Sequence, residues 1–410
     1  MSVLKLAWRS LTQHRVSSLV TIFSIALATG LVMAVFAIQA QSYAAFTGGA
    51  GGFDAVLGAR GSQLQLVLNT VFHLETSPGN IPWSLYQAIS QDPRVARAIP
   101  YAVGDNYRGF RIVGTSPELF QKGFQLAPGG QLFEPNSRQA LVGSFVAQRT
   151  GLKPGSRFNP YHGVVFSESA RHEEEYTVVG VLEPTSSPAD RVIWIPLEGI
   201  FRMSGHVLRG TGEDFQARPD EEIPDQHKQI SAVMLELKSS QAGFALDQTI
   251  NKQGQVATLA WPVGRVMAEL FDKLGWMNRV LALVAYLIVA VSCASILAGL
   301  YNTIDQRRRE LAILRALGAP RRTLLGLILL ESGLLAGLGS LAGLLVYAAI
   351  LAVAAAVVRG QTGVVLGILD FHPVLVLAPL GVTALGTLAG LLPAWKAYRT
   401  DVASNLAPPA

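Results

Sequence analysis

Charged residues are scarce in this chain of 410 residues, and cysteine is nearly absent. Only 15% of the side chains are charged and 50% are hydrophobic, whereas about 25% are charged in an ordinary soluble protein. The single cysteine, Cys293, excludes an intramolecular disulfide and a zinc site built from several cysteines. The composition therefore argues against a soluble globular protein and indicates a membrane protein.

Several catalytic motifs are also missing. No GxxxxGK loop followed by Ser or Thr occurs, so ATP hydrolysis through a P-loop has to come from another polypeptide. His172-Glu173-Glu174-Glu175 begins like the zinc-protease motif HExxH, but Tyr176 replaces the second histidine, and we interpret the stretch as solvated charge. The nucleophile elbow GxSxG is absent. We expect no catalytic residue, no cofactor site and no metal site in this chain.

Four long stretches are nearly free of charge. Each is long enough for the roughly 20 residues of helix that cross the hydrocarbon core of a membrane. The predicted spans are 19–40, 280–304, 323–358 and 372–395. The third is longer than one perpendicular span needs, but no polar turn divides it, so the sequence predicts one helix there and a four-helix membrane protein.

The first 18 residues have the pattern of an amphipathic helix. Val3, Leu4, Ala7, Trp8 and Leu11 share one helical face, and the basic residues fall outside it. A secretory signal has a hydrophobic region of only about 7–15 residues before a small-residue cleavage site. We therefore predict a helix over 1–18 that lies on the cytoplasmic membrane surface and leads into an uncleaved span.

Basic groups gather in the short segments beside the predicted spans. Segments 1–18, 302–322 and 396–401 together carry a net charge of +8, whereas the long segment 41–276 carries −3. Lys and Arg in short loops mark the cytoplasmic side of a membrane protein. Both termini, including the tail 396–410, are therefore predicted to lie in the cytoplasm, and segment 41–276 is predicted to lie outside.

The predicted outer segment 41–276 has the composition of a soluble domain. Runs of β-branched residues bounded by Gly or Pro predict strands over 111–114, 140–143, 176–182 and 192–196. Helices are predicted over 83–89 and 144–150, and Gly151 is placed to end the second helix. We predict a mixed α/β domain in two lobes, inserted between the first and second spans.

Two groups of titratable residues stand out. The outer segment holds five of the seven histidines, which are scattered in sequence: His73, His162, His172, His206 and His227. Whether they meet around a metal ion stays open. Glu331 lies inside the third span, where a carboxylate is costly and usually has a partner. We expect it to form a structural ion pair with Arg321, Arg322 or the basic loop before them.

Four stretches of the chain resemble the MacB-like and FtsX-like permeases of ABC transporters. The first is Ala7-Trp8-Arg9-Ser10-Leu11 and the residues up to Leu19, and the second is Ala140-Leu141-Val142-Gly143 with Tyr176-Thr177-Val178-Val179-Gly180-Val181-Leu182. The most specific is Arg309-Glu310-Leu311-Ala312-Ile313-Leu314-Arg315-Ala316-Leu317-Gly318-Ala319, and the last is Pro393-Ala394-Trp395-Lys396-Ala397-Tyr398-Arg399. The stretch 53–83 departs from the family pattern and leaves the cargo open.

The resemblance implies a permease subunit whose segment 305–322 holds a cytoplasmic coupling helix. In that scheme the helix docks on a separate ATP-binding subunit, and ATP binding there moves the spans and changes the shape of a MacB-type outer domain. The implied coupling residues are Arg309, Glu310, Leu311, Leu314, Arg315, Leu317 and Gly318. The leucines recur at helical spacing and Gly318 supplies a stop. The alternative is that the arginines only set topology and bind anionic lipid.

The resemblance also implies partners and cargo. The expected partners are an ABC ATP-binding subunit, a second permease copy or paralogue, a periplasmic adaptor or binding protein, and lipid of the bacterial inner membrane, but no nucleic acid. The expected cargo is periplasmic or outer-leaflet: a lipoprotein, a peptide or a small molecule. One alternative is a regulatory scaffold that activates a cell-wall hydrolase, as FtsX-like relatives do, although their outer domains are smaller. The other is a zinc uptake permease, which only the outer histidines suggest.

Overall fold

The chain divides into two compact units. The computed structural model describes residues 3–48, 51–163, 167, 170–203, 208–209, 214–215, 221–306, 313, 315–316, 318–368 and 370–399. The first of the two units, here called the helical unit, comprises Met1–Ser42, Leu274–Ala356 and Leu366–Ala410. The second, the sheet unit, comprises Tyr43–Lys273 and Val357–Val365. The sheet unit thus contains most of segment 41–276 together with a short later piece, which lies outside the predicted outer segment.

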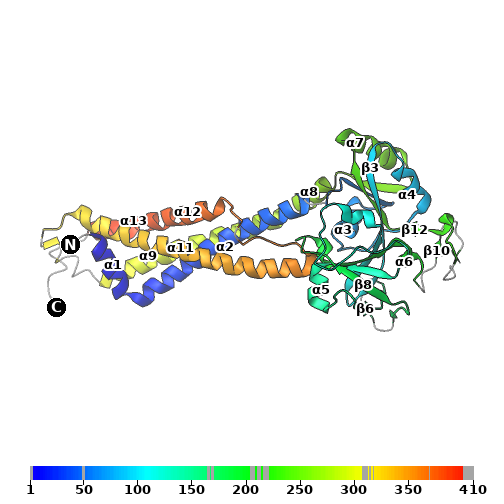
Figure 1. The fold of residues 1–410 in the computed structure, drawn as a ribbon. Coiled ribbons are helices and arrows are strands. Elements are labelled where there is room, and N and C mark those ends of the chain that lie inside the picture. Colours follow the sequence, from blue (N-terminus) through cyan, green and yellow to red (C-terminus); the bar gives the residue numbers. More distant parts are fainter. Residues whose placement is uncertain are drawn as a thin grey trace. The chain divides into compact units, whose positions relative to one another are not determined.

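Apolar helices that run alongside one another build the helical unit (Figure 1). They are α1 (Val3–Gln13), α2 (Arg15–Gly48), α9 (Gly275–Gln306), α11 (Arg321–Thr362), α12 (Val374–Ala389) and α13 (Leu391–Arg399). Four helical stretches among the described residues are long and apolar enough to cross a membrane: Arg15–Gly48, Gly275–Asn302, Arg321–Thr362 and Val374–Trp395. A helix suits a lipid environment because its backbone groups bond within the helix itself.

The third and fourth apolar stretches form their helices differently. Helix α11 is continuous over 42 residues, and at 1.5 Å per residue it is about 63 Å long, roughly twice the hydrocarbon thickness. Its last residues lie in Val357–Val365 and therefore belong to the sheet unit. The stretch 372–395 is instead divided at Gly390 into α12 and α13. Pro393 follows closely and cannot donate a backbone hydrogen bond to Ala389, which favours a break at this point.

One large sheet organises the sheet unit. Its strand order is β14-β1-β13-β3-β4-β9-β5-β8-β6, and β7 pairs with β3 as a tenth strand. The strands are β1 (Ala55–Ala59), β3 (Val95–Tyr107), β4 (Phe110–Thr115), β5 (Gln139–Val142), β6 (Arg157–Phe158), β7 (Tyr161–His162), β8 (Tyr176–Val181), β9 (Val192–Pro196), β13 (Ala232–Leu237) and β14 (Ala257–Ala260). Two small ladders join β10 (Leu208–Arg209) to β11 (Asp214–Phe215) and β12 (Gln229–Ile230) to β2 (Ile81–Pro82).

The local predictions for this unit are confirmed. The four predicted strands correspond to β4, β5, β8 and β9. The two predicted helices are α4 (Trp83–Ser90) and α5 (Ser144–Thr150). Gly151 ends α5 with a φ of 77°, the left-handed conformation that glycine adopts without strain. The unit is a mixed α/β domain, as the sequence predicts.

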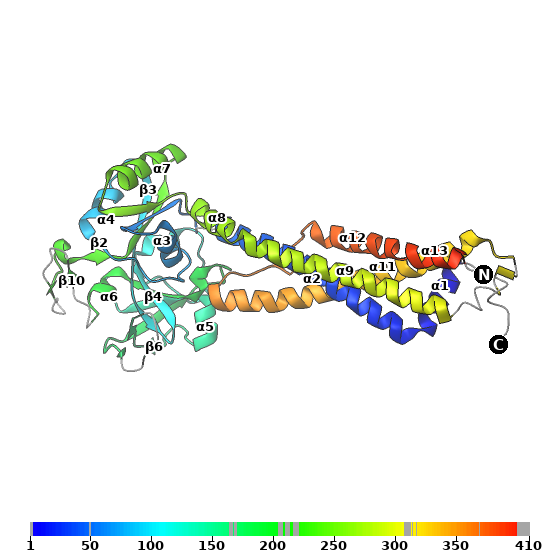
Figure 2. The same ribbon diagram turned by 180° about the vertical axis from the view of Figure 1, so that it is seen from behind.

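Both faces of the large sheet are apolar and covered by helices (Figure 2). Alternation along β1 sends Leu57 into one core and Val56 into the other, because successive side chains of a strand point to opposite faces. The Val56 core is closed by α3 (Gln63–Thr70) and α8 (Val263–Lys273), and the Leu57 core by α4, α5, α6 (Leu197–Phe201) and α7 (Ser240–Asp247). A polar group within such a sheet is therefore buried and needs a partner.

Candidate functional site

The segment with the predicted coupling role is only partly described. Arg309, Glu310, Leu311, Leu314 and Leu317 lie outside the described residues, as do Arg307 and Arg308. Gly318 is described, and its φ of 95° places it in the left-handed region that ends helices. Its N–H donates to the carbonyl of Arg315 at 3.0 Å, and α11 begins three residues later. The docking role of this segment stays a prediction.

The N-terminal helix α1 buries a narrower face than its apolar pattern predicts. Ala7, Ser10 and Leu11 are buried, whereas Leu4 and Trp8 are 56% and 53% exposed. The Oγ of Ser18 in α2 donates to the carbonyl of Leu11 at 3.1 Å and ties the two helices at their junction. Within this chain, α1 therefore packs through Ala7, Ser10 and Leu11 and leaves Leu4 and Trp8 exposed.

Glu331 of α11 meets Ser10 of α1, a partner outside the basic residues that its sequence neighbourhood suggests. Its Oε1 accepts a 2.6 Å hydrogen bond from the Oγ of Ser10, and the two residues are 6% and 2% exposed. Among the described residues it is the one charged side chain buried in the helical unit. The expected ion pair with Arg321, Arg322 or the basic loop stays a prediction. The sequence does contain a signal for Ser10: it follows Ala7 by three positions, and this helical spacing places it on the buried face of α1.

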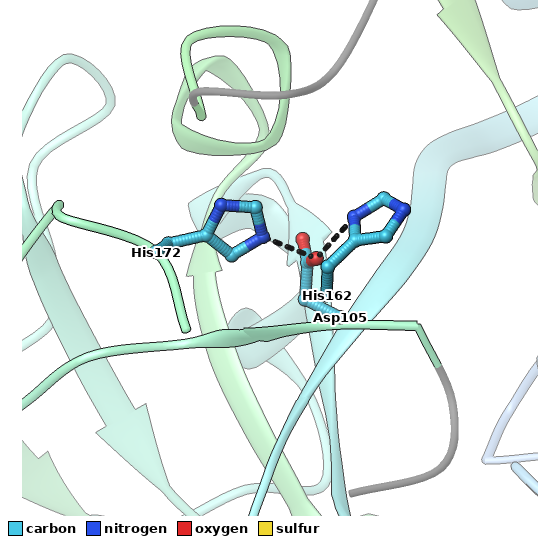
Figure 3. Close-up of side chains that lie close together, drawn as sticks. All are labelled: Asp105, His162 and His172. Atoms are coloured by element: carbon cyan, nitrogen blue, oxygen red, sulfur yellow. Dashed lines mark hydrogen bonds and ion pairs between the residues drawn. The ribbon is translucent and has the colours of Figure 1, made fainter. Parts of the chain in front are cut away.

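A second polar cluster lies in the sheet unit, where His162, His172 and Asp105 converge (Figure 3). Nε2 of His172 lies 3.0 Å from Oδ1 of Asp105, and Nδ1 of His162 lies 3.5 Å from the same oxygen. The two imidazole rings stand edge to face with their centroids 5.6 Å apart. The Asp105 side chain is fully buried and that of His172 is 6% exposed, but that of His162 is 55% exposed.

This cluster corrects one interpretation of the sequence and bears on a question that the sequence left open. His172 is buried and bonded to Asp105, so the stretch that begins with it is not simply solvated charge. Two of the scattered histidines also do come together, which linear spacing could not reveal. Of the remaining outer histidines, His73 and His227 lie outside the cluster, and His206 is outside the described residues.

His73 has a separate, structural setting. Its Nδ1 lies 2.8 Å from the hydroxyl of Tyr101, and its ring stacks on that of Tyr101 with centroids 5.7 Å apart. Burial, followed by the positive charge of Arg111, lowers the pKa of His73 to about 3. Burial likewise raises the pKa of Tyr101 to about 12. Both groups are therefore neutral at physiological pH, and His73 serves as a packed hydrogen-bonding residue.

A cavity of about 390 Å³ opens next to His73. It is lined by Phe72, His73, Leu74, Glu75, Thr76, Gly109, Phe110, Arg111, Pro188, Arg191, Gln361 and Thr362. The guanidinium of Arg111 is already used, because it donates to Asn69 and to the carbonyl of Glu75. Arg191 instead lies over the rings of Phe110 and Phe145, and burial lowers its pKa. The cavity is thus an aromatic and cationic hollow within the sheet unit.

Across the described residues, these two units define a membrane protein with four helical stretches long enough to cross a bilayer and one α/β domain. The family model for the FtsX-like permease C-terminal region matches residues 282–402, and that for the MacB-like periplasmic core domain matches residues 18–252. The second match covers more than half of the chain. The chain therefore belongs to the MacB-like and FtsX-like family of ABC transporter permeases, as its motifs predict.

Curated relatives of this chain include two proteins named "Macrolide export ATP-binding/permease protein MacB". That of Nitrobacter winogradskyi is 31% identical over 131 residues, which are 32% of this chain and 19% of the relative. That of a Shewanella species is 25% identical over 334 residues, which are 78% of this chain and 46% of the relative. The chain thus spans at most about half the length of these relatives.

Among solved structures, the periplasmic region of MacB from Actinobacillus actinomycetemcomitans aligns at 10% identity with a TM-score of 0.33. The alignment covers 54% of this chain and 94% of that structure.

Proposed function

We propose that this chain is the permease subunit of an ABC transporter in the bacterial inner membrane. A separate cytoplasmic ATP-binding subunit hydrolyses ATP, and the permease converts this into a change of shape in the sheet unit on the periplasmic side. This proposal rests on the observation that one chain matches both the FtsX-like permease model and the MacB-like periplasmic core model. The absence of a P-loop from its 410 residues supports assigning ATP hydrolysis to a partner.

Two continuous helices are suited to transmit this change. Helix α2 and helix α11 each contribute residues to both units. A helix carries displacement along its axis because every turn is hydrogen-bonded to the next. The proposed coupling segment ends at Gly318, just before α11 begins at Arg321. Movement of a docked ATP-binding subunit would thereby reach the segment Val357–Val365 of the sheet unit.

The interior of the helical unit supports the proposal that the cargo is handled outside the bilayer. Apart from Glu331, its buried polar side chains among the described residues are hydroxyls: Ser10, Thr21, Thr29, Ser292, Ser332 and Ser340. Several bond to carbonyls of their own helix, as Ser340 does to Ala336 at 2.6 Å. Such groups do not make a charged or hydrated path. The cargo classes that fit are lipoproteins, peptides and small molecules of the periplasm or outer leaflet, moved by a dimer of permeases.

The test targets the proposed coupling helix. The full chain, tagged and isolated from its native membrane with its partners, is expected to carry a vanadate-sensitive ATPase. Leu314→Asp should remove this ATPase activity without reducing membrane insertion, because a carboxylate in an apolar contact costs several kcal/mol. The control neutralises Arg308 and Arg309. If that control loses the ATPase while Leu314→Asp retains it, the segment binds through charge and the docking role is wrong.

The partner that co-purifies with the chain distinguishes a regulatory scaffold from a transporter. A scaffold would co-purify with a periplasmic cell-wall hydrolase, and its ATP hydrolysis would change hydrolase activity rather than cargo distribution.

Metal uptake is the second candidate function, because Asp105, His162 and His172 converge in the sheet unit.

A further inference from the structure

We propose that Asp105, His162 and His172 form a binding site for one divalent transition-metal ion of the zinc class. One carboxylate and two imidazoles form a ligand set that Zn²⁺ accepts, with the remaining position left to water. Hard cations such as Mg²⁺ and Ca²⁺ prefer all-oxygen sites. The site is therefore expected to select transition metals over these two ions.

The spacing of the three donors fits a tetrahedral ion. Ligand atoms that each lie 2.0–2.1 Å from zinc at the tetrahedral angle are about 3.3 Å from one another. The two distances from Oδ1 of Asp105, 3.0 Å to His172 and 3.5 Å to His162, lie on either side of this value. All three donor atoms lie within 4.8 Å of one another. His162 is the exposed member of the three, so its side chain is the one with room to adjust when an ion binds.

The backbone holds the ligand-bearing segments in place. Asp105 of β3 is the register partner of His162 of β7, so strand pairing sets their separation. The neighbouring Asn106 reinforces the pair, because its Nδ2 donates to the carbonyls of Tyr161 at 3.3 Å and Gly163 at 2.8 Å. These contacts hold two of the three ligands close together before any ion binds.

The remaining ligand is fixed in the same way. The backbone N–H of His172 donates to the carbonyl of Pro160 at 2.9 Å, one residue before β7. An isolated bridge between Tyr161 and Arg171 adds a second attachment. Asp105 itself lies next to a register shift between β3 and β4, after Val103. Such irregularities re-aim side chains and are over-represented beside functional sites.

The burial of the ligands indicates an exchangeable ion. Asp105 and His172 form a buried base, while the side chain of His162 is 55% exposed. A closed structural zinc site would hold four protein ligands, whereas the described residues supply three here. The open side lets an ion enter and leave without unfolding of the sheet. The site is thus suited to sensing or presenting a metal ion outside the membrane.

Zinc titration of the full chain in detergent tests the proposal. The protein carries an affinity tag without histidine, is stripped with chelator, and is titrated calorimetrically with Zn²⁺ in the presence of excess Mg²⁺. One ion is expected to bind per chain. His162→Gln should weaken binding at least tenfold, and Asp105→Asn and His172→Gln should abolish it. Co²⁺ should give visible absorption bands in the parent chain that His162→Gln loses.

The matched control is His372→Gln, which removes a histidine of the helical unit whose Nδ1 accepts from the N–H of Val374. This variant should bind zinc like the parent chain. The exposed position of His162 makes its variant the decisive one, because its replacement leaves the buried base in place. Zinc binding that is absent from the parent chain, or equally strong in His162→Gln and the parent chain, would overturn the proposal.

Discussion

Asp105 in the sheet unit and Glu331 in the helical unit are both carboxylates that are nearly excluded from solvent, yet they meet different partners. Asp105 meets imidazoles, one of which is its register partner on a paired strand. Glu331 meets the hydroxyl of Ser10, 321 positions away along the chain. Strand pairing fixes a partner through the backbone, whereas helix packing fixes it only through the fit of side chains. The second arrangement is therefore more sensitive to the small residues around it.

The two units also differ in what fills their interiors. Tyr101, Tyr176 and Phe72 are among the largest fully buried side chains of the sheet unit. In the helical unit, α2 and α11 approach through glycines instead: a Cβ added at Gly343 would lie 2.9 Å from Cβ of Thr29. Large apolar side chains gain by leaving water, but lipid offers no such gain, so helices there associate through close backbone contact.

The largest expected effect breaks this close contact. Gly343→Leu should destabilise the helical unit by about 3 kcal/mol, because overpacking forces α2 and α11 apart. Gly326→Leu in the same helix is the matched control, since a Cβ there would meet nothing within 4 Å. Thermal unfolding of the two variants in detergent measures the difference. Equal melting temperatures would show that the glycine contact does not hold the helices together.

A smaller effect is expected from separating Ser10 and Glu331. Ser10→Ala should cost about 2 kcal/mol, since it removes a hydrogen bond to a buried carboxyl group. Glu331→Gln should cost less and leave ATP-dependent activity intact, because the amide oxygen still accepts from Ser10. The double variant should show that the two losses are not additive. Normal accumulation of Glu331→Gln in the membrane with lost transport would instead assign the carboxylate to the mechanism.

The last effect concerns pH and the sheet unit, and it is the smallest of the three only near neutral pH. Because burial and Arg111 lower the pKa of His73 to about 3, the folded chain stays unprotonated there while the unfolded chain binds a proton below about pH 6.5. Stability from this residue is therefore present above pH 6.5 and is lost as the pH falls toward 3, by on the order of 1 kcal/mol per pH unit.

His73→Asn tests that sign. Asparagine tolerates the positive φ of 55° at this position and does not titrate. Its melting temperature should fall less steeply between pH 6.5 and pH 4 than that of the parent chain. The two proteins differ only at this position, so the difference between their pH profiles reports on His73. Parallel pH profiles would contradict the assignment.

The sequence alone predicted the features that depend on neighbouring residues. Strand β9 and helix α5 with its terminal Gly151 follow from β-branched content and from glycine's freedom to adopt positive φ. The apolar helices follow from length, because about 20 residues of helix cross a bilayer. Family membership followed from motifs spread along the chain, and the two family models confirm it.

Only the tertiary structure decided which polar residues meet. Asp105 and His172 are 67 positions apart, and nothing in either local segment predicts their contact. The bond from Ser10 to Glu331 likewise depends on how α1 packs against α11. The last residues of α11 join the sheet unit, because the helix continues past the predicted span 323–358 to Thr362. Local pattern fixes the conformation of a segment, but contacts between distant segments depend on the packing of the whole unit, which a linear spacing does not encode.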